Sequence, residues 1–210
     1  MPMIAPISSD IFVRRILKPL IWAGGLAPAI WLAWRAWLVF HGQADALGVN
    51  PVAYLNQYLG DWALRFLLVA LALTPIRLIT GWNKLVRVRR LVGLFAFFYV
   101  VLHLSSYIGI DQFFDWRAIW LDVIKRTYIT VGMGSFIILV ALAATSTRGM
   151  IKRLGGGRWN LLHKTVYAAG ILACLHFYMM RKGVQLEPII YAGILLVLLI
   201  VRGLYRLKRR

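Results

Sequence analysis

The chain has 210 residues, of which 61% are hydrophobic and only 15% are charged, and its formal net charge is +18. Because about a quarter of the residues of a soluble domain are charged, this composition excludes an ordinary soluble domain and indicates an integral membrane protein. The basic residues are confined to alternate connections between apolar runs, which is a topology pattern rather than a nucleic-acid-binding surface. The single cysteine, Cys174, excludes an internal disulfide and a CxxC redox pair.

Six segments are long and apolar enough to cross a bilayer, since a spanning helix needs about 20 mostly apolar residues. They cover residues 17–40, 61–80, 91–110, 128–147, 161–180 and 187–205. The first is interpreted as a membrane span rather than a cleavable signal peptide, because it is long and lacks a small-residue cleavage site. The connections are too short for a separate flavin or nucleotide domain. We therefore expect an all-α integral membrane protein, with an N-terminal segment 1–16, a six-helix domain 17–205 and a basic tail 206–210.

The orientation follows from the lysines and arginines of the connections, which concentrate on the cytoplasmic side of membrane proteins. They cluster before the first span, between the second and third, between the fourth and fifth, and after the sixth. The other connections, among them the mixed-charge stretch 111–126, would lie outside. Both termini are therefore predicted to be cytoplasmic.

Two histidines fall at matching depth in different spans. His103 lies 13 residues after Arg90 and His176 lies 12 residues after Lys164, which is about 20 Å and 18 Å along helices that run the same way. An ionisable side chain inside a bilayer is costly and marks a functional site. Two facing imidazoles could provide both axial ligands of a haem iron, whereas the simpler alternative for each is a hydrogen bond to a neighbouring helix.

His163 lies near the cytoplasmic end of the fifth span and is harder to pair. It precedes His176 by 13 residues, which puts the two side chains about 140° apart around an ideal helix. Either the helix is tightened, for example near Gly170, or His163 faces something different. A second haem would need a partner near positions 89 and 90, which are arginines. His163 could thus bind a second haem, line a site where electrons enter from flavin or quinone, or bond a propionate. His41 is interpreted as interfacial.

Aromatic residues are available both around the histidines and in the outer connection. The candidates for the walls of a haem pocket are Phe95, Phe98, Tyr99, Tyr167 and Phe177. In the stretch 111–126, four apolar residues recur at helical spacing among charges, which predicts an amphipathic helix on the outer membrane surface. These residues are Phe113, Trp116, Trp120 and Val123. This helix could anchor the interface, or it could cover the outer haem and dock a partner through Asp111, Asp115 and Asp122.

Several stretches resemble a known family. LHLSSY with the upstream VRRLVGLFAFF, and GRWNLLHKTVY followed by His176, resemble ferric-reductase-like transmembrane domains. Within that superfamily the chain is similar to the MsrQ family, the haem-binding membrane subunit of the periplasmic protein-methionine-sulfoxide reductase system. Further matching stretches are NPVAYLNQYLGDWALRFL, LTPIR and DVIKRTYITVGM, so the resemblance extends from about residue 40 to residue 205.

The resemblance implies a haem b protein of the bacterial inner membrane that transfers electrons without catalysing a reaction itself. Electrons would come from the quinone pool or a cytosolic flavin reductase and go to MsrP, a periplasmic molybdenum enzyme that reduces methionine sulfoxide in proteins. The cofactor-binding histidines of the family correspond to His103, His163 and His176. The resemblance also adds FMN as a candidate cofactor, although the sequence shows no FMN site. The second histidine that NADPH-oxidase relatives carry on the third helix is absent.

Three alternative functions fit parts of the pattern. One is a ferric reductase that acts directly on metal ions, and another is an electron carrier similar to cytochrome b561. The third is a small transporter that uses its histidines as proton relays. The sequence shows no convincing inverted repeat with paired broken helices, which many transporters contain, so the transporter is the least favoured of the three.

Overall fold

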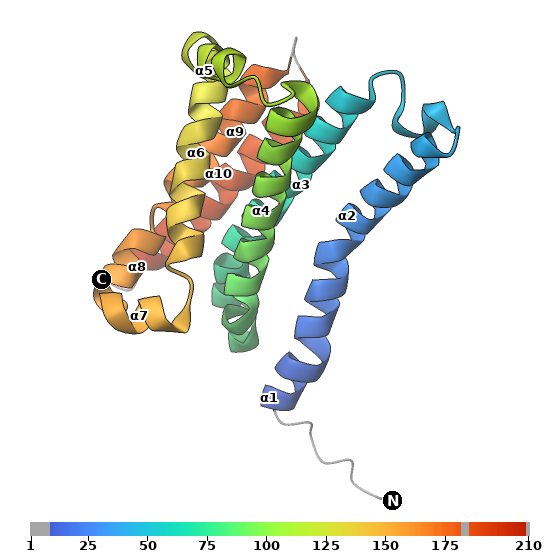
Figure 1. Cartoon of the computed structure of the whole chain (residues 1–210). Coiled ribbons are helices and arrows are strands. Elements are labelled where there is room, and N and C mark those ends of the chain that lie inside the picture. Colours follow the sequence, from blue (N-terminus) through green and yellow to red (C-terminus); the bar gives the residue numbers. More distant parts are fainter. Residues whose placement is uncertain (1–8, 182–184, 209–210) are drawn as a thin grey trace, which may run out of the picture.

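The computed structural model describes residues 9–181 and 185–208, and within these ranges the regular structure is entirely helical. Figure 1 shows long helices that alternate in direction and pack side by side, with α5 across one end and α7 and α8 at the other. The elements are α1 (Ser9–Phe12), η1 (Val13–Leu17), α2 (Lys18–Phe40), η2 (Ala44–Leu47), α3 (Pro51–Thr80), η3 (Asn83–Leu85), α4 (Val86–Ser106), η4 (Tyr107–Asp111), α5 (Trp116–Lys125), α6 (Thr127–Ala144), α7 (Arg148–Leu154), α8 (Gly156–His163), α9 (Val166–Met180) and α10 (Leu186–Leu207).

The chain is a multi-pass membrane protein, and five helical stretches of the described residues are long and apolar enough to cross a membrane: Val13–Phe40, Ala44–Thr80, Asn83–Asp111, Thr127–Ala144 and Leu186–Leu207. The predicted span 161–180 is not among them, because the chain turns between α8 and α9. The helix α9 alone has 15 residues. Six spans and the predicted segment boundaries at residues 16 and 206 therefore stay predictions.

The helix α3 begins ten residues earlier than the predicted span 61–80. Asn50 accepts a hydrogen bond from the backbone N–H of Ala53, and Pro51 occupies the first helical position. Asn at the N-cap followed by Pro is a strong helix start, because both satisfy or remove orphan N–H groups. The helix ends at Gly81, whose φ of +71° is the left-handed conformation that glycine tolerates. Part of the predicted outer connection is thus the first three turns of α3.

The core of the bundle lies between α3, α4, α6, α9 and α10. Ala96 of α4 and Ala169 of α9 are fully buried there, and Ser135 of α6 donates a hydrogen bond to the carbonyl of Ala169 at 2.9 Å. Gly170 allows α9 to approach its neighbours, because a Cβ at this position would lie 3.2 Å from Leu71 and 3.4 Å from Leu195. Small residues at such contacts let membrane helices pack closely. The short helix α9 is therefore an integral part of the bundle.

The helix α2 joins the bundle through the hydroxyl of Tyr99, which is fully buried on α4. This hydroxyl donates to the carbonyl of Gly25 at 2.7 Å and accepts from the N–H of Ala29 at 3.0 Å. In an uninterrupted helix that N–H would bond the same carbonyl. Pro28 lies between them within α2, and proline disturbs the local helical ladder. Tyr99 thus repairs the break in α2 while it attaches α2 to α4.

The predicted amphipathic helix forms as α5, at the end of the bundle opposite α7 and α8 (Figure 1). It begins at Trp116, with Asp115 as the N-cap that accepts from the N–H of Ala118 at 3.0 Å. Trp116 and Trp120 are exposed, at 66% and 65%. Phe113 is not part of the helical face, because it lies in the preceding turn with a φ of +45°. The helix is thus one turn shorter than the pattern predicted.

Candidate functional site

The structure brings His103 of α4 and His176 of α9 together, about one turn before the C-terminal end of each helix. Their ring centroids are 6.3 Å apart and the ring planes are inclined by 71°. Both side chains are half-buried. The matched depth predicted from the sequence therefore corresponds to a direct juxtaposition of two imidazoles.

Each of these histidines is held by a backbone carbonyl of a neighbouring helix. Nδ1 of His103 donates to the carbonyl of Asn56 on α3 at 2.9 Å, and Nδ1 of His176 donates to the carbonyl of Tyr128 on α6 at 2.7 Å. A carbonyl oxygen can only accept, so Nδ1 carries the proton in both rings and the lone pair of each neutral imidazole lies on Nε2. Metal-binding histidines are typically fixed in this way.

Two glycines leave the space that the rings occupy. A Cβ at Gly132 of α6 would lie 2.8 Å from Nδ1 of His176, and a Cβ at Gly60 of α3 would lie 3.3 Å from Cε1 of His103. Each glycine follows its acceptor residue by four positions, Gly60 after Asn56 and Gly132 after Tyr128. The same arrangement of carbonyl, glycine and imidazole thus occurs twice, once between α3 and α4 and once between α6 and α9.

The distance between the rings fits two axial ligands of one metal ion. Imidazole nitrogen binds first-row metals at about 2.0 Å, and the ring centre lies roughly 1.1 Å beyond that nitrogen, so opposed ligands have centroids about 6.2 Å apart. The observed value is 6.3 Å. Among the described residues no group of three or more His, Cys, Asp or Glu side chains could hold a metal ion. The pair therefore suits a metal that brings its other ligands with it, as haem iron does.

Asn56 is itself fixed to α4. Its side-chain oxygen accepts from Ser106, whose hydroxyl lies 2.9 Å away and is also 2.8 Å from the carbonyl of His103. Neither Asn56 nor the two glycines was identified from the sequence. Their only common signal is a glycine four residues after the acceptor within an apolar run, which is too frequent in membrane helices to be specific.

The aromatic residues expected to form the walls of a haem pocket do not surround the histidine pair. Phe95 and Tyr99 pack with α2 and α3 in a separate cluster, and Phe98 is at the surface of α4. Phe177 contacts Tyr191 of α10, with ring centroids 5.7 Å apart. Helical spacing did not reveal which side of α4 faces α2, and this side carries the aromatics. An aromatic ring that does lie close is Tyr128, 6.1 Å from His176.

His163 belongs to a different site, at the end of α8. Its Nε2 lies 3.3 Å from the hydroxyl of Thr145, and its ring stacks on Trp159 with centroids 3.9 Å apart. Trp159 in turn donates from Nε1 to the carbonyl of Thr145 at 2.9 Å. The predicted tightening of the chain occurs just after His163 rather than near Gly170.

Three i→i−3 backbone hydrogen bonds, from the N–H groups of residues 164, 165 and 167, produce this tightening. A 3₁₀ turn rotates by about 120° per residue instead of 100°. The angle of about 140° between the side chains of His163 and His176, which assumes an ideal helix, therefore does not apply.

A cavity of about 450 Å³ extends from His163 between α3, α4, α6 and α10. Four cationic side chains line it, namely Arg89, Arg90, Lys164 and Arg202. The two arginines at the positions where a second histidine pair would need a ligand thus face the same cavity as His163. Tyr167, expected near the haem, also lines this cavity. The site can accommodate a ligand that carries negative charge.

His41 forms local contacts only. Its Nδ1 lies 2.9 Å from the carbonyl of Trp37, and the centroids of the two rings are 3.9 Å apart with the ring planes inclined by 30°. The side chain is exposed at the end of α2, in agreement with an interfacial position.

The chain is similar to known proteins at two levels, a broad transmembrane class and a particular family within it. Residues 59–174, more than half of the chain, match the family described as ferric reductase like transmembrane component. The protein is thus a ferric-reductase-like transmembrane protein; the matched region contains His103 and His163 and ends two residues before His176.

The chain also matches full-length relatives named protein-methionine-sulfoxide reductase heme-binding subunit MsrQ. It is 53% identical to the protein of Rhodospirillum rubrum over 93% of this chain and 91% of that protein. It is 47% identical to that of Caulobacter vibrioides over 87% and 84% of the two chains. For Xanthomonas oryzae the identity is 45%, over 93% and 89%. The chain therefore belongs to the MsrQ family.

Proposed function

We propose that this protein is a haem b electron-transfer subunit and that His103 and His176 are the axial ligands of its haem. The observation that carries the proposal is the 6.3 Å separation of the two imidazole centroids. The carbonyl bonds to Nδ1 and the two glycines support it, because they fix each ring with Nε2 available. When bound, the haem would supply reversible one-electron chemistry. The protein would supply the ligands, their orientation and a bundle interior that excludes water.

We propose that the chain crosses the bacterial inner membrane six times, with both termini in the cytoplasm. The alternation of basic connections supports this orientation. As the sixth span, α9 would cover about 22 Å. A span shorter than the hydrocarbon core is accommodated by local thinning of the bilayer and by snorkelling of flanking residues, such as Lys164 and Arg181. In this orientation His163 lies toward the cytoplasm, and His103 and His176 lie toward the periplasm.

We propose that electrons enter near His163 and leave near the histidine pair. The four cations that line the cavity with His163 suit the propionates of a second haem or the phosphate of FMN. Either ligand would connect a cytosolic flavin reductase or the quinone pool to the outer haem. The stacked Trp159 and the bonded Thr145 hold the imidazole at the edge of this cavity.

The names of the relatives, which describe heme-binding subunits of a protein-methionine-sulfoxide reductase, support a proposal for the electron acceptor. We propose that this chain delivers electrons to the periplasmic, molybdenum-dependent enzyme MsrP, which repairs methionine sulfoxide in oxidised proteins. The chain would then be the non-catalytic subunit of the system. The helix α5, with its exposed tryptophans, is the candidate docking surface for this partner.

The spectrum of the purified protein tests the haem assignment. We expect the sharp reduced bands of a low-spin haem b in the wild type, and the loss of this haem in His103→Ala and in His176→Ala. His41→Ala is the matched control and should keep the full haem content. A colourless wild-type protein, or a variant that lacks either ligand and keeps the full haem content of the wild type, would contradict the proposal.

The haem-to-protein ratio of His163→Ala tests the inner site separately. A fall from two haems to one would assign His163 as a ligand of a second haem. A ratio of one in both proteins, together with slower reduction of the variant by a flavin reductase, would assign it to the site where electrons enter. Equal ratios together with equal reduction rates would remove His163 from the pathway.

A further inference from the structure

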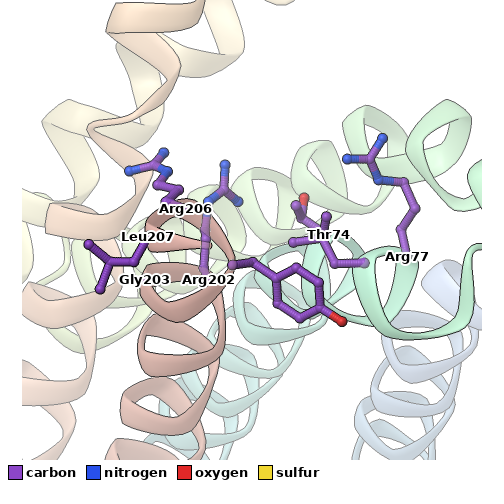
Figure 2. A pocket seen from close by; sticks show the side chains of 8 residues that line it. Thr74, Arg77, Arg202, Gly203, Arg206 and Leu207 are labelled. Carbon is purple, nitrogen blue, oxygen red and sulfur yellow. The ribbon is translucent and has the colours of Figure 1, made fainter. Parts of the chain in front are cut away.

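A second cavity, of about 660 Å³, lies between the ends of α3 and α10. Three arginines line it, Arg77 from α3 and Arg202 and Arg206 from α10. Figure 2 shows Arg202 and Arg206 on α10 at one side of Thr74 and Arg77 on α3 at the other side. Three like charges from two helices thus line one cavity.

No acidic residue occurs among the described residues that line this cavity. Nε of Arg77 is buried and has no hydrogen-bond partner in the part of the chain that the structure describes. The guanidinium of Arg202 lies over the ring of Tyr167, 4.8 Å from its centroid, rather than beside a carboxylate. Buried charges are normally paired, because an unpaired one loses its hydration without compensation. The three arginines therefore favour an anion that the described residues do not supply.

We propose that this cavity binds the phosphate headgroup of an anionic phospholipid. Arginine matches phosphate because its planar fork donates two parallel hydrogen bonds, and basic pockets between membrane helices bind anionic headgroups. Arg77 and Arg202 lie three and five residues before the last residues of their helices, which is about one turn inside the end of each. This is the depth at which a spanning helix meets the headgroup region.

The surroundings favour a lipid over free phosphate. Leu78 and Leu207 line the cavity together with the arginines. Next to them Ile76 and Leu204 are exposed, at 41% and 55%. Exposed apolar residues beside several cations suit a ligand that has a charged head and acyl chains. Inorganic phosphate would use only the cations.

The two cavities share Thr74 and Arg202. The hydroxyl of Thr74 also accepts from Nη1 of Arg89, a residue of the His163 cavity, at 3.2 Å. A headgroup bound by Arg202 would therefore fix a side chain that both cavities share, and the lipid would stabilise the wall of the His163 site.

Lipid binding to the purified, detergent-solubilised full chain tests this proposal. Phosphatidylglycerol and phosphatidylcholine are added in micelles, and the bound lipid is counted by native mass spectrometry. We expect one retained phosphatidylglycerol per chain and no retained phosphatidylcholine. Two charge-assisted hydrogen bonds are removed in Arg77→Gln/Arg206→Gln, which should weaken phosphatidylglycerol binding at least about tenfold. The control Arg148→Gln/Arg153→Gln makes the same charge change on α7 and should bind as the wild type does.

Arg206→Gln alone guards against a folding defect, because this side chain is exposed, and it should still weaken binding severalfold. Equal retention of both lipids, or an equal loss in the α7 control, would overturn the proposal. Displacement of phosphatidylglycerol by millimolar inorganic phosphate would also overturn it and assign the cavity to free phosphate.

Discussion

Gly132 of α6 lies so close to His176 of α9 that a Cβ at position 132 would come within 2.8 Å of Nδ1. The same nitrogen is bound to the carbonyl of Tyr128 at 2.7 Å. The ring therefore cannot move away from a larger residue without losing the bond that sets its tautomer. We expect Gly132→Ala to lose most of the haem, as measured by the haem-to-protein ratio.

The matched control for this substitution is Gly134→Ala on the same helix. A Cβ at Gly134 would lie 3.5 Å from Leu172, which is an ordinary contact, and alanine in a helix is favoured over glycine by about 0.5–1 kcal/mol. This variant should keep its haem and be at least as stable as the wild type. At Gly60 the corresponding distance is 3.3 Å, so Gly60→Ala should give an intermediate loss. Full haem content in Gly132→Ala would contradict the prediction, because the ring of His176 would then accommodate the added methyl group.

Replacing the side chain of either acceptor residue should leave the haem in place, because the acceptors are backbone carbonyls. We expect Asn56→Ala and Tyr128→Ala to retain haem with an unchanged reduced spectrum. The former loses its bond to Ser106 and should be destabilised by about 1 kcal/mol, which thermal unfolding can detect. Haem loss in both variants would mean that the side chains, and not the carbonyls, position the histidines.

Tyr99→Phe should loosen α2 without affecting the histidine pair. The substitution removes the hydroxyl that bonds both Gly25 and Ala29, and leaving buried backbone groups without partners costs about 1–3 kcal/mol. Tyr58→Phe is the comparison, since its hydroxyl makes one bond to α2, to the carbonyl of Pro28 at 3.2 Å. Thermal unfolding should rank the wild type above Tyr58→Phe and Tyr99→Phe last, with equal haem content. An equal stability of all three would contradict the role of Tyr99.

The docking role of the outer connection can be tested with Asp111→Asn. Neutralising all three aspartates would confuse docking with folding, because Asp115 caps α5 and Asp122 binds both Arg126, at 2.9 Å, and the hydroxyl of Tyr107. If the negative charge of Asp111 guides the partner, Asp111→Asn should slow electron transfer to it severalfold at low salt, with little effect at high salt. An unchanged rate at low salt would remove this residue from the docking surface.

The sequence predicted those parts of the site that depend on depth along a helix. His103 and His176 could be matched because residue counting from the basic flanks gives depth directly. Which side of each helix faces the protein interior was harder to predict. Membrane helices are apolar all round, so the sequence of the lipid-facing side resembles that of the buried side. For this reason Phe95 and Tyr99 are candidates for the haem pocket by sequence, whereas they pack toward α2 in the structure.

Local backbone chemistry accounts for the other differences. The break between α8 and α9 follows from 3₁₀ hydrogen bonds, which no single residue type announces. The early start of α3 could have been predicted from Asn50 and Pro51, but hydropathy concealed it because the first turns of α3 are polar. The contacts of His163 with Thr145 and Trp159 connect residues 18 and 4 positions away, and only the folded chain brings all three together.

The attachment of both proposed ligand histidines to backbone carbonyls should make the site tolerant of side-chain substitution at the acceptor positions. Every amino acid carries a carbonyl, so positions 56 and 128 can change their side chains and still orient the imidazoles. The site is instead sensitive to substitution four residues later, at positions 60 and 132. Proline there would clash with the same carbonyls, and larger residues would displace the rings. The proposed haem site therefore depends on the path of two helix backbones, which Gly60 and Gly132 allow to pass close to the rings.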